Sequence, residues 1–231
     1  MEKKNWKELE QILGVKFKNI DLLRQALVHR SYLNENPSFE LPHNERLEFL
    51  GDAVLELVVT ESLYKNYPNP EGELTNWRAS LVNAKMLAEV SNELNIEDFL
   101  YLSRGEAKDK NSKARQYILA NAFESVTGAI YLDQGVKAVT AFIKRELLSK
   151  LDYIIENKLY MDPKSKFQEI AQEKITVTPN YKVLAETGPD HNKWFKVGVY
   201  LGNEMVAAGE GSSKQEAQVD AAEKGLKEKG W

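Results

Sequence analysis

The chain has 231 residues, enough for one large domain or two ordinary ones, and its 42% share of hydrophobic residues excludes global disorder. Its net charge is −4, and the segment from Pro163 to the end carries 10 basic and 10 acidic residues, so a polyanionic partner would have to bind local basic patches. The absence of cysteine excludes disulfides, thiolate catalysis and Cys-ligated zinc, and without a signal peptide or a run of ~20 apolar residues we expect a cytoplasmic protein with no membrane partner.

Two short helices are predicted before residue 44. The spacing of apolar residues predicts the first over residues 5–13 and the second over residues 22–29, with Asp21 as its cap. His29 stands close to Ser31, a combination used in nucleophilic catalysis, but no acidic partner occurs at a recognisable spacing. We therefore interpret His29 as a structural residue at the end of the second helix.

Residues 44–66 are predicted to form one long helix, which His43 and Asn44 can cap. Its core face is predicted to consist of Leu47, Leu50, Val54, Leu57 and Val58. A second face carries an acidic row made of Glu45, Glu48 and Asp52. From the spacing alone, this row is either a solvated surface or a cation site. Gly51 costs roughly 1 kcal/mol relative to alanine inside a helix, which predicts that something approaches the backbone there.

Phe49 projects close to the acidic row and away from the core face, so packing in the core does not explain it. The run from Glu45 to Leu55 reads Glu-Arg-Leu-Glu-Phe-Leu-Gly-Asp-Ala-Val-Leu. It resembles, without a break, the signature helix of the ribonuclease III family, whose members cut double-stranded RNA. The resemblance implies a homodimer in which Phe49 enters a pocket of the second copy, although a lone exposed Phe is also common on monomers.

Three further helices are predicted over residues 73–93, 114–132 and 136–155, after a turn at 67–72 and around a charged loop at 104–111. In the second of these helices, Asn121 and Glu124 share one face. Its buried surface is assigned to Tyr117, Ala120, Phe123, Val126, Thr127 and Ile130. No stretch up to residue 156 alternates convincingly as a strand does, so residues 1–156 are expected to form an all-α domain.

The pattern changes after a linker at residues 157–162. Pro163 directly after Asp162 predicts the start of a helix, and a final helix is predicted after Ser213. Between them, Val- and Tyr-rich strands are predicted over residues 180–187, 194–201 and 204–209. This α-β-β-β-α order over residues 163–231 resembles a double-stranded RNA-binding domain. The predicted fold is therefore multidomain, an all-α endonuclease domain followed by a small α+β domain.

The resemblance implies metal-dependent hydrolysis of phosphodiester bonds. Mg²⁺, with Mn²⁺ as a substitute, makes a bound water nucleophilic and neutralises phosphate charge when carboxylates hold it. The implied metal ligands are Glu48, Asp52, Asn121 and Glu124, of which Glu48, Asp52 and Glu124 are the implied catalytic residues. Glu45 and Glu71 are implied to lie near the scissile strand, although an acidic residue in the turn at 67–72 is equally well an ordinary surface group.

Asn121 departs from the family pattern, in which most members have Asp at this position. An amide oxygen is a hard but neutral ligand, so it attracts Mg²⁺ less strongly than a carboxylate does. Three explanations stay open: the lineage tolerates Asn, the change inactivates the site, or the protein has become a binder. We favour a working nuclease because Glu48, Asp52 and Glu124 remain.

Duplex RNA hides its base edges, so its recognition rests on 2′-hydroxyl and phosphate contacts. The resemblance implies three contact surfaces: the first helix of the second domain, the turn between its first two strands, and the start of its last helix. Their implied residues are Lys164, Lys166, Gln168, Glu169, Pro189, Asp190, His191, Lys193, Ser212, Ser213 and Lys214.

The predicted function is an endoribonuclease that cleaves double-stranded RNA, leaves 5′-phosphate and 3′-hydroxyl ends, and processes precursors of ribosomal, messenger and transfer RNA. The alternative is a non-catalytic double-stranded-RNA-binding protein on the same scaffold. Mg²⁺-dependent cleavage of a plain duplex would separate the two. A structural helical protein with an accidental acidic face would not explain the second domain.

Overall fold

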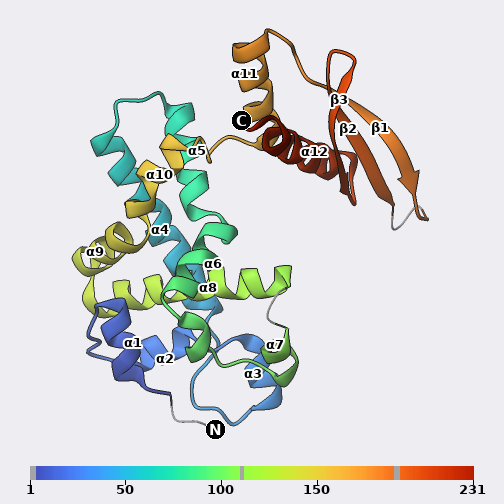
Figure 1. The fold of residues 1–231 in the computed structure, drawn as a ribbon. Coiled ribbons are helices and arrows are strands. Elements are labelled where there is room, and N and C mark those ends of the chain that lie inside the picture. Colours follow the sequence, from blue (N-terminus) through green and yellow to red (C-terminus); the bar gives the residue numbers. More distant parts are fainter. Residues whose placement is uncertain (1–3, 110–111, 190–192) are drawn as a thin grey trace. The chain divides into compact units, whose positions relative to one another are not determined.

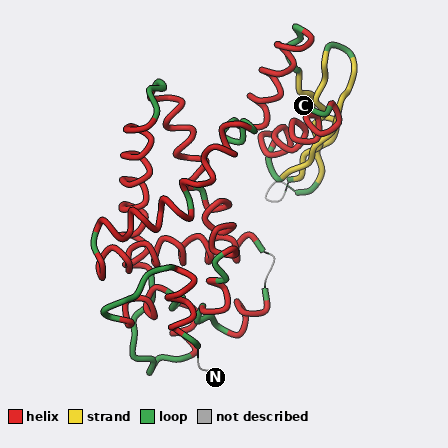
Figure 2. Tube along the Cα trace, turned by 60° about the vertical axis from the view of Figure 1, so that its left-hand side comes forward, coloured by secondary structure: helices red, strands yellow, loops and turns green. Residues whose placement is uncertain are grey.

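The chain divides into two compact units. In the computed structural model, which describes residues 4–109, 112–189 and 193–231, they span Met1–Asn157 and Lys158–Trp231. Among the described residues, all strands belong to the second unit, while the first is built from helices and loops (Figure 2). The predicted fold class, an all-α unit followed by a small α+β unit, is confirmed.

The first unit is organised around α4 and α8, two helices of 22 residues each that cross one another (Figure 1). Its α-helices are α1 (Trp6–Leu13), α2 (Ile20–Ala26), α3 (Arg30–Glu35), α4 (Glu45–Asn66), α5 (Glu71–Val82), α6 (Ala84–Glu93), α7 (Arg104–Lys108), α8 (Lys113–Gln134), α9 (Val136–Glu146) and α10 (Leu151–Glu156). Short 3₁₀ helices lie at η1 (Ile96–Phe99) and η2 (Leu148–Lys150).

The residues that begin the early helices differ from those predicted. Asn19, not Asp21, caps α2, because its side-chain oxygen accepts the backbone N–H of Asp21 at 3.1 Å. His29 does not end α2 but caps α3, with its Nδ1 accepting the N–H of Ser31 at 3.3 Å. Asn44 directly precedes α4 without capping it, since its amide donates to the carbonyl of Ala26 at 3.3 Å.

Two of the helices that were predicted as continuous are interrupted in the structure. The one over residues 73–93 is two helices, because Asn83 takes an extended conformation and its side chain accepts the N–H of Met86 to begin α6. The one over residues 136–155 is interrupted by η2. The predicted loop over residues 104–111 contains the short helix α7, which Ser103 caps.

The crossing of α4 and α8 depends on two glycines. A Cβ added to Gly51 would lie 1.7 Å from the carbonyl oxygen of Glu124, and one added to Gly128 would lie 2.4 Å from the carbonyl oxygen of Leu47. The predicted close approach at Gly51 is therefore confirmed, and its partner is the backbone of α8. At each of these positions, any larger residue would have to push the two helices apart.

The predicted core face of α4 is confirmed for Leu47, Val54 and Val58, which are buried, but it was wrong for Leu57. The side chain of Leu57 is 66% exposed. At 3.6 residues per turn, Leu57 lies about 120° around the helix from Gly51, so it points away from the crossing with α8. Leu50 is only partly buried.

The second unit packs two helices against one sheet. Asp162 caps the first helix, with Pro163 in its first turn as predicted. The antiparallel strands lie in the order β1-β2-β3. The elements are α11 (Pro163–Ile175), β1 (Asn180–Thr187), β2 (Trp194–Leu201), β3 (Glu204–Gly211) and α12 (Lys214–Lys229).

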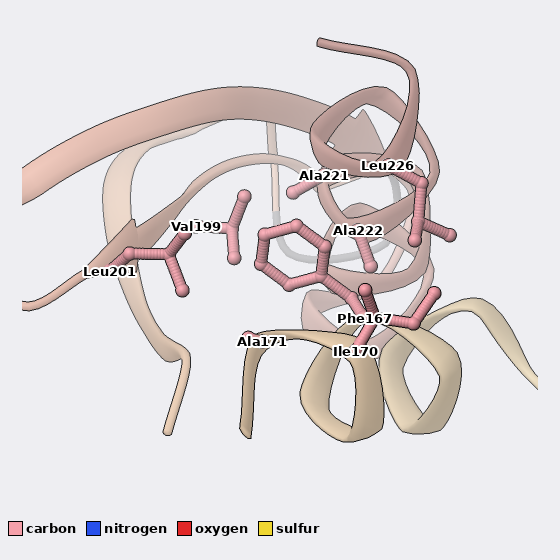
Figure 3. Packing of buried hydrophobic residues seen from close by; sticks show 8 residues of the cluster. All are labelled: Phe167, Ile170, Ala171, Val199, Leu201, Ala221, Ala222 and Leu226. Carbon is pink, nitrogen blue, oxygen red and sulfur yellow. The ribbon is translucent and has the colours of Figure 1, made fainter. Parts of the chain in front are cut away.

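The core of the second unit surrounds Phe167 of α11. Figure 3 shows its ring between Val199 of β2 and Ala222 of α12. The face of α12 toward this core is slim, because Ala217, Ala221 and Ala222 on it are fully buried. On the facing strand β3, a Cβ at Gly209 would lie only 2.1 Å from the backbone nitrogen of Ala221, so α12 sits almost directly on the backbone of β3.

Candidate active site

The crossing of α4 and α8 brings four polar side chains into mutual reach: Glu48, Asp52, Asn121 and Glu124. Asn121 donates a side-chain hydrogen bond to the carboxylate of Glu48. The charges of Asp52 and Glu48 both act on Glu124 from the facing helix. These four residues, which we call the crossing cluster, are separated by up to 76 positions in the sequence and meet because the two glycines let the helix backbones touch.

Two carboxyl groups of the crossing cluster, those of Glu124 and Glu48, have raised pKa values. Burial, followed by the charges of Asp52 and Glu48, raises the pKa of Glu124 to about 7. Burial, followed by the charge of Glu45, also raises the pKa of Glu48, while the hydrogen bond from Asn121 opposes this shift. Partly buried carboxylates that repel one another form a site that a bound cation would stabilise.

The donors of the crossing cluster fit a hard divalent cation. Carboxylate and amide oxygens are the protein ligands that Mg²⁺ and Mn²⁺ prefer. Within the described residues, no three His, Cys, Asp or Glu side chains are already arranged to hold a metal ion. Binding would therefore require the oxygens of Glu48, Asp52 and Glu124 to move closer together, which the repulsion between ionised carboxylates opposes until a cation is bound.

The two further acids expected near the scissile strand lie in different surroundings. Glu45 flanks the crossing cluster and contacts Arg30 Nη1 at 3.3 Å and His43 Nδ1 at 3.7 Å. Glu71 does not lie in a turn, as predicted, but is the first residue of α5. It lines a cleft of ≈ 650 Å³ together with Leu63 and other residues near the C-terminal end of α4.

The crossing cluster and Glu71 do not come together within one chain. Glu48 lies in the first turn of α4, whereas the cleft that Glu71 lines begins at Thr60 and extends past Leu63. At 1.5 Å per residue, the 15 positions from Glu48 to Leu63 span roughly 22 Å of helix.

Phe49 belongs to a longer exposed face of α4. Phe49 is 82% exposed, Leu57 66% and Tyr64 78%. At 100° per residue these three side chains point within about 80° of one another, and Phe49 alone adjoins the acidic row, about 40° from Glu45 and about 60° from Asp52. We call them the exposed α4 face. The sequence pattern singled out Phe49 on this face but neither Leu57, which was assigned to the core, nor Tyr64, whose position about 60° from Phe49 around the helix was the available signal.

Tyr117 of α8 is not part of the core, which corrects the prediction made for it. Its side chain is 60% exposed, whereas Ala120, Phe123, Val126, Thr127 and Ile130 are buried as predicted. The reason is helical phase: at 100° per residue Tyr117 lies about 40° from Asn121, and so on the side of α8 that carries the crossing cluster.

In the second unit, the lysines expected to contact RNA already have partners within the chain. Lys164 Nζ donates to Gln218 Oε1 at 2.7 Å, Lys193 pairs with Glu186 at 2.9 Å, and Lys214 Nζ lies 5.6 Å from the ring centre of Phe195. Lys166 is partly buried on α11.

The other expected RNA contacts lie at the surface. Gln168 and Glu169 are exposed on α11, where Glu169 pairs with Lys158 at 2.7 Å. Pro189 is exposed after β1, while Asp190 and His191 lie outside the described residues. Ser212 and Ser213 are exposed directly before α12, and the Ser213 hydroxyl caps this helix by accepting the N–H of Glu216 at 3.1 Å.

Comparisons with known proteins cover both units. A family model described as Ribonuclease-III-like matches residues 19–151, and a Double-stranded RNA binding motif matches residues 163–229. Ribonuclease 3 of Carboxydothermus hydrogenoformans is 42% identical over 98% of this chain and 96% of its own length. Ribonuclease 3 of Desulforamulus reducens is 44% identical over 93% and 87%.

A solved structure agrees with these matches. The nuclease domain of ribonuclease III from Campylobacter jejuni is 40% identical, covers 63% of this chain and 97% of its own, and superposes with a TM-score of 0.56. No helix in the part of the chain that the structure describes is long and apolar enough to span a bilayer. The two family models together cover both units in their order along the chain, and the chain belongs to the ribonuclease III family.

Proposed function

We propose that this endoribonuclease for double-stranded RNA hydrolyses phosphodiester bonds at the crossing cluster with Mg²⁺, for which Mn²⁺ can substitute. The observation that carries the proposal is the meeting of Glu48, Asp52 and Glu124 at the crossing, where Glu48 and Glu124 are partly buried, Asp52 is exposed, and the charges of Glu48 and Asp52 act on Glu124. When bound, Mg²⁺ supplies a nucleophilic water and relief of charge on the phosphate oxygens.

The residues of the crossing cluster have separable roles. Glu48, Asp52 and Glu124 supply the negative oxygens that hold the cation. Asn121 orients Glu48 by donating a hydrogen bond to it, and its own amide oxygen would accept from a water or bind the cation. Attack of water on phosphorus with departure of the 3′ oxygen leaves a 5′-phosphate and a 3′-hydroxyl end.

The partner that covers the exposed α4 face is a second copy of this chain. One crossing cluster cuts one strand, so a duplex requires two clusters, and a twofold dimer provides them. Phe49, Leu57 and Tyr64 form an apolar surface that adjoins the acidic row at Phe49, and burial of this surface against a partner would set both clusters in one assembly. The Campylobacter jejuni relative is described as having a region involved in dimer formation of its nuclease domain.

The second unit adds affinity for duplex RNA through α11, the end of β1 and the start of α12. Several of its lysines are paired within the chain, which supports modest affinity for this unit alone. The start of α12, with Ser212, Ser213 and Lys214, would contact a phosphate, since a helix N-terminus favours negative charge, although Glu216 already accepts the N–H of Ser212 there. We place this activity in the cytoplasm, in the processing of ribosomal, messenger and transfer RNA precursors.

The deciding experiment incubates a long RNA duplex with the chain and with Glu124→Gln, each with and without Mg²⁺. We expect cleavage only by the unaltered chain with the cation, and binding by both. If the unaltered chain binds the duplex and leaves it intact at every Mg²⁺ and Mn²⁺ concentration, the chain is the non-catalytic binder that Asn121 leaves open.

A further inference from the structure

Tyr117 is exposed beside the crossing cluster without a packing role. It lies four residues before Asn121 and seven before Glu124 on α8. At 1.5 Å per residue these separations are about 6 Å and 10 Å along the helix, and the three side chains point within about 60° of one another. Its side chain is 60% exposed, and its hydroxyl has no hydrogen-bond partner among the described residues.

The charge around Tyr117 favours a neutral group that can approach RNA. The crossing cluster is acidic and repels a polyanion until a cation is bound. A phenol carries no charge and offers one hydrogen-bond donor on a rigid ring. Tyrosine hydroxyls are among the groups that bind sugar and phosphate oxygens in protein–nucleic acid interfaces. A strand whose scissile phosphate lies at Glu48 and Glu124 would also pass within reach of this ring.

We propose that the Tyr117 hydroxyl donates a hydrogen bond to the sugar–phosphate backbone of the RNA strand beside the scissile phosphate and thereby positions that phosphate for hydrolysis. The role rests on the proposed function, because it requires cleavage at the crossing cluster. Tyr117 acts on the placement of the cleaved strand and not on overall duplex affinity, to which the second unit also contributes.

The first test measures single-turnover cleavage of a short duplex by the full chain at saturating enzyme. We expect Tyr117→Phe, which removes only the hydroxyl, to slow cleavage about 10-fold, the scale of one hydrogen bond to a charged group. Tyr153→Phe is the matched control, since Tyr153 is a 63% exposed tyrosine on α10, away from the cluster, and should cut at the unaltered rate. Duplex affinity, measured in the Glu124→Gln background, should change less than about 2-fold.

The second test identifies the acceptor. Duplexes carry a single 2′-deoxy or a single methylphosphonate substitution at successive nucleotides beside the cut. At one position, the substitution should slow the unaltered chain about 10-fold and leave Tyr117→Phe nearly unaffected, because the bond is already lost. Coupling to 2′-deoxy identifies a ribose hydroxyl, and coupling to methylphosphonate identifies a phosphate oxygen.

Several outcomes would overturn the role. If Tyr117→Phe cleaves at the unaltered rate, the hydroxyl donates no hydrogen bond that matters for cleavage. This holds also if Tyr117→Ala is slow, because the ring and not the hydroxyl then contributes. If no substituted nucleotide slows the unaltered chain more than it slows Tyr117→Phe, the acceptor is not on the sugar–phosphate backbone. A monomeric Tyr117→Phe would place the residue in the dimer contact instead. If the unaltered chain cuts no duplex, the proposed function itself fails, which is a different result from slow cutting by the variant alone.

Discussion

In the first unit, the charged residues of the site lie where two long helices touch. In the second unit, the residues assigned to RNA binding lie on the surface: on an exposed face of α11, at the end of β1 and at the start of α12. At the crossing cluster, position depends on the core, because the same backbone atoms that pack α4 against α8 also place Glu48 and Glu124. In the second unit, the residues assigned to RNA are not members of the buried cluster around Phe167. Chemistry that needs fixed geometry therefore lies on the rigid crossing, and binding that tolerates variation lies on the surface.

The variant with the largest expected effect removes one charge from the crossing cluster. We expect Glu124→Gln to lower the cleavage rate by about 1000-fold or more, because a ligand of the proposed cation is lost, while duplex affinity changes little. Cleavage and binding should be measured on the same duplex. Equal losses of the two would show that Glu124 contributes to RNA binding and not to chemistry.

The next test concerns the exposed α4 face. We expect Phe49→Asp to raise the dimer dissociation constant by about 100-fold, the effect of removing one buried aromatic anchor and introducing a charge. Sedimentation at several protein concentrations measures it, with Tyr153→Asp as a control that exchanges an exposed aromatic residue on α10. A monomeric unaltered chain at micromolar concentration would contradict the two-cluster arrangement.

Removal of the second unit tests how much its surface contacts contribute to duplex binding. A chain truncated before Pro163 should remain a folded dimer, bind duplex about 10-fold to 100-fold more weakly, and still cut at low salt, since phosphate contacts weaken as salt rises. Circular dichroism and a binding titration over salt concentration provide the readouts. An unfolded fragment would mean that the first unit depends on the second for stability.

Asn121→Asp would sharpen the account of the crossing cluster. The added carboxylate should lower the Mg²⁺ concentration required for half-maximal cleavage by about 10-fold, because a charged ligand or ligand partner holds the cation more tightly. The measurement is the cleavage rate as a function of Mg²⁺ concentration. Identical curves would show that Asn121 already performs the role of Asp, and cleavage by the Asp form alone would mean that the unaltered chain is an inactive binder.

The smallest expected effect is on the stability of the metal-free protein. The folded pKa of Glu124 lies near 7, above its ordinary value, so the stability that this carboxyl contributes is present at acidic pH and is lost as the pH rises through about 7. Glu124→Gln should therefore raise the free energy of unfolding by about 1 kcal/mol near pH 8, after allowance for partial exposure, and by less near pH 5. Denaturant titrations with a chelator present, at both pH values, measure the difference.

The sequence predicted the fold class, the extent of α4 and the three strands, because these depend on periodic patterns that are local. The residues of the crossing cluster followed from a resemblance, and their meeting in space could not be derived from spacing alone. The errors arose where tertiary contacts override local pattern. Leu57 and Tyr117 fit helical core positions by type, yet both point away from the packed faces of α4 and α8.

The direct contact of α4 with α8 through Gly51 and Gly128 also has a consequence for amide hydrogen exchange. Backbone groups at this crossing are shielded from water by another backbone, so the amides of α4 and α8 near them should be among the slowest to exchange. Removal of a bound cation would leave this shielding in place, because it comes from the helices and not from the ligands. Exchange near the glycines should therefore report on global unfolding, and the side chains of the crossing cluster can rearrange around a cation while the backbone that carries them stays closed.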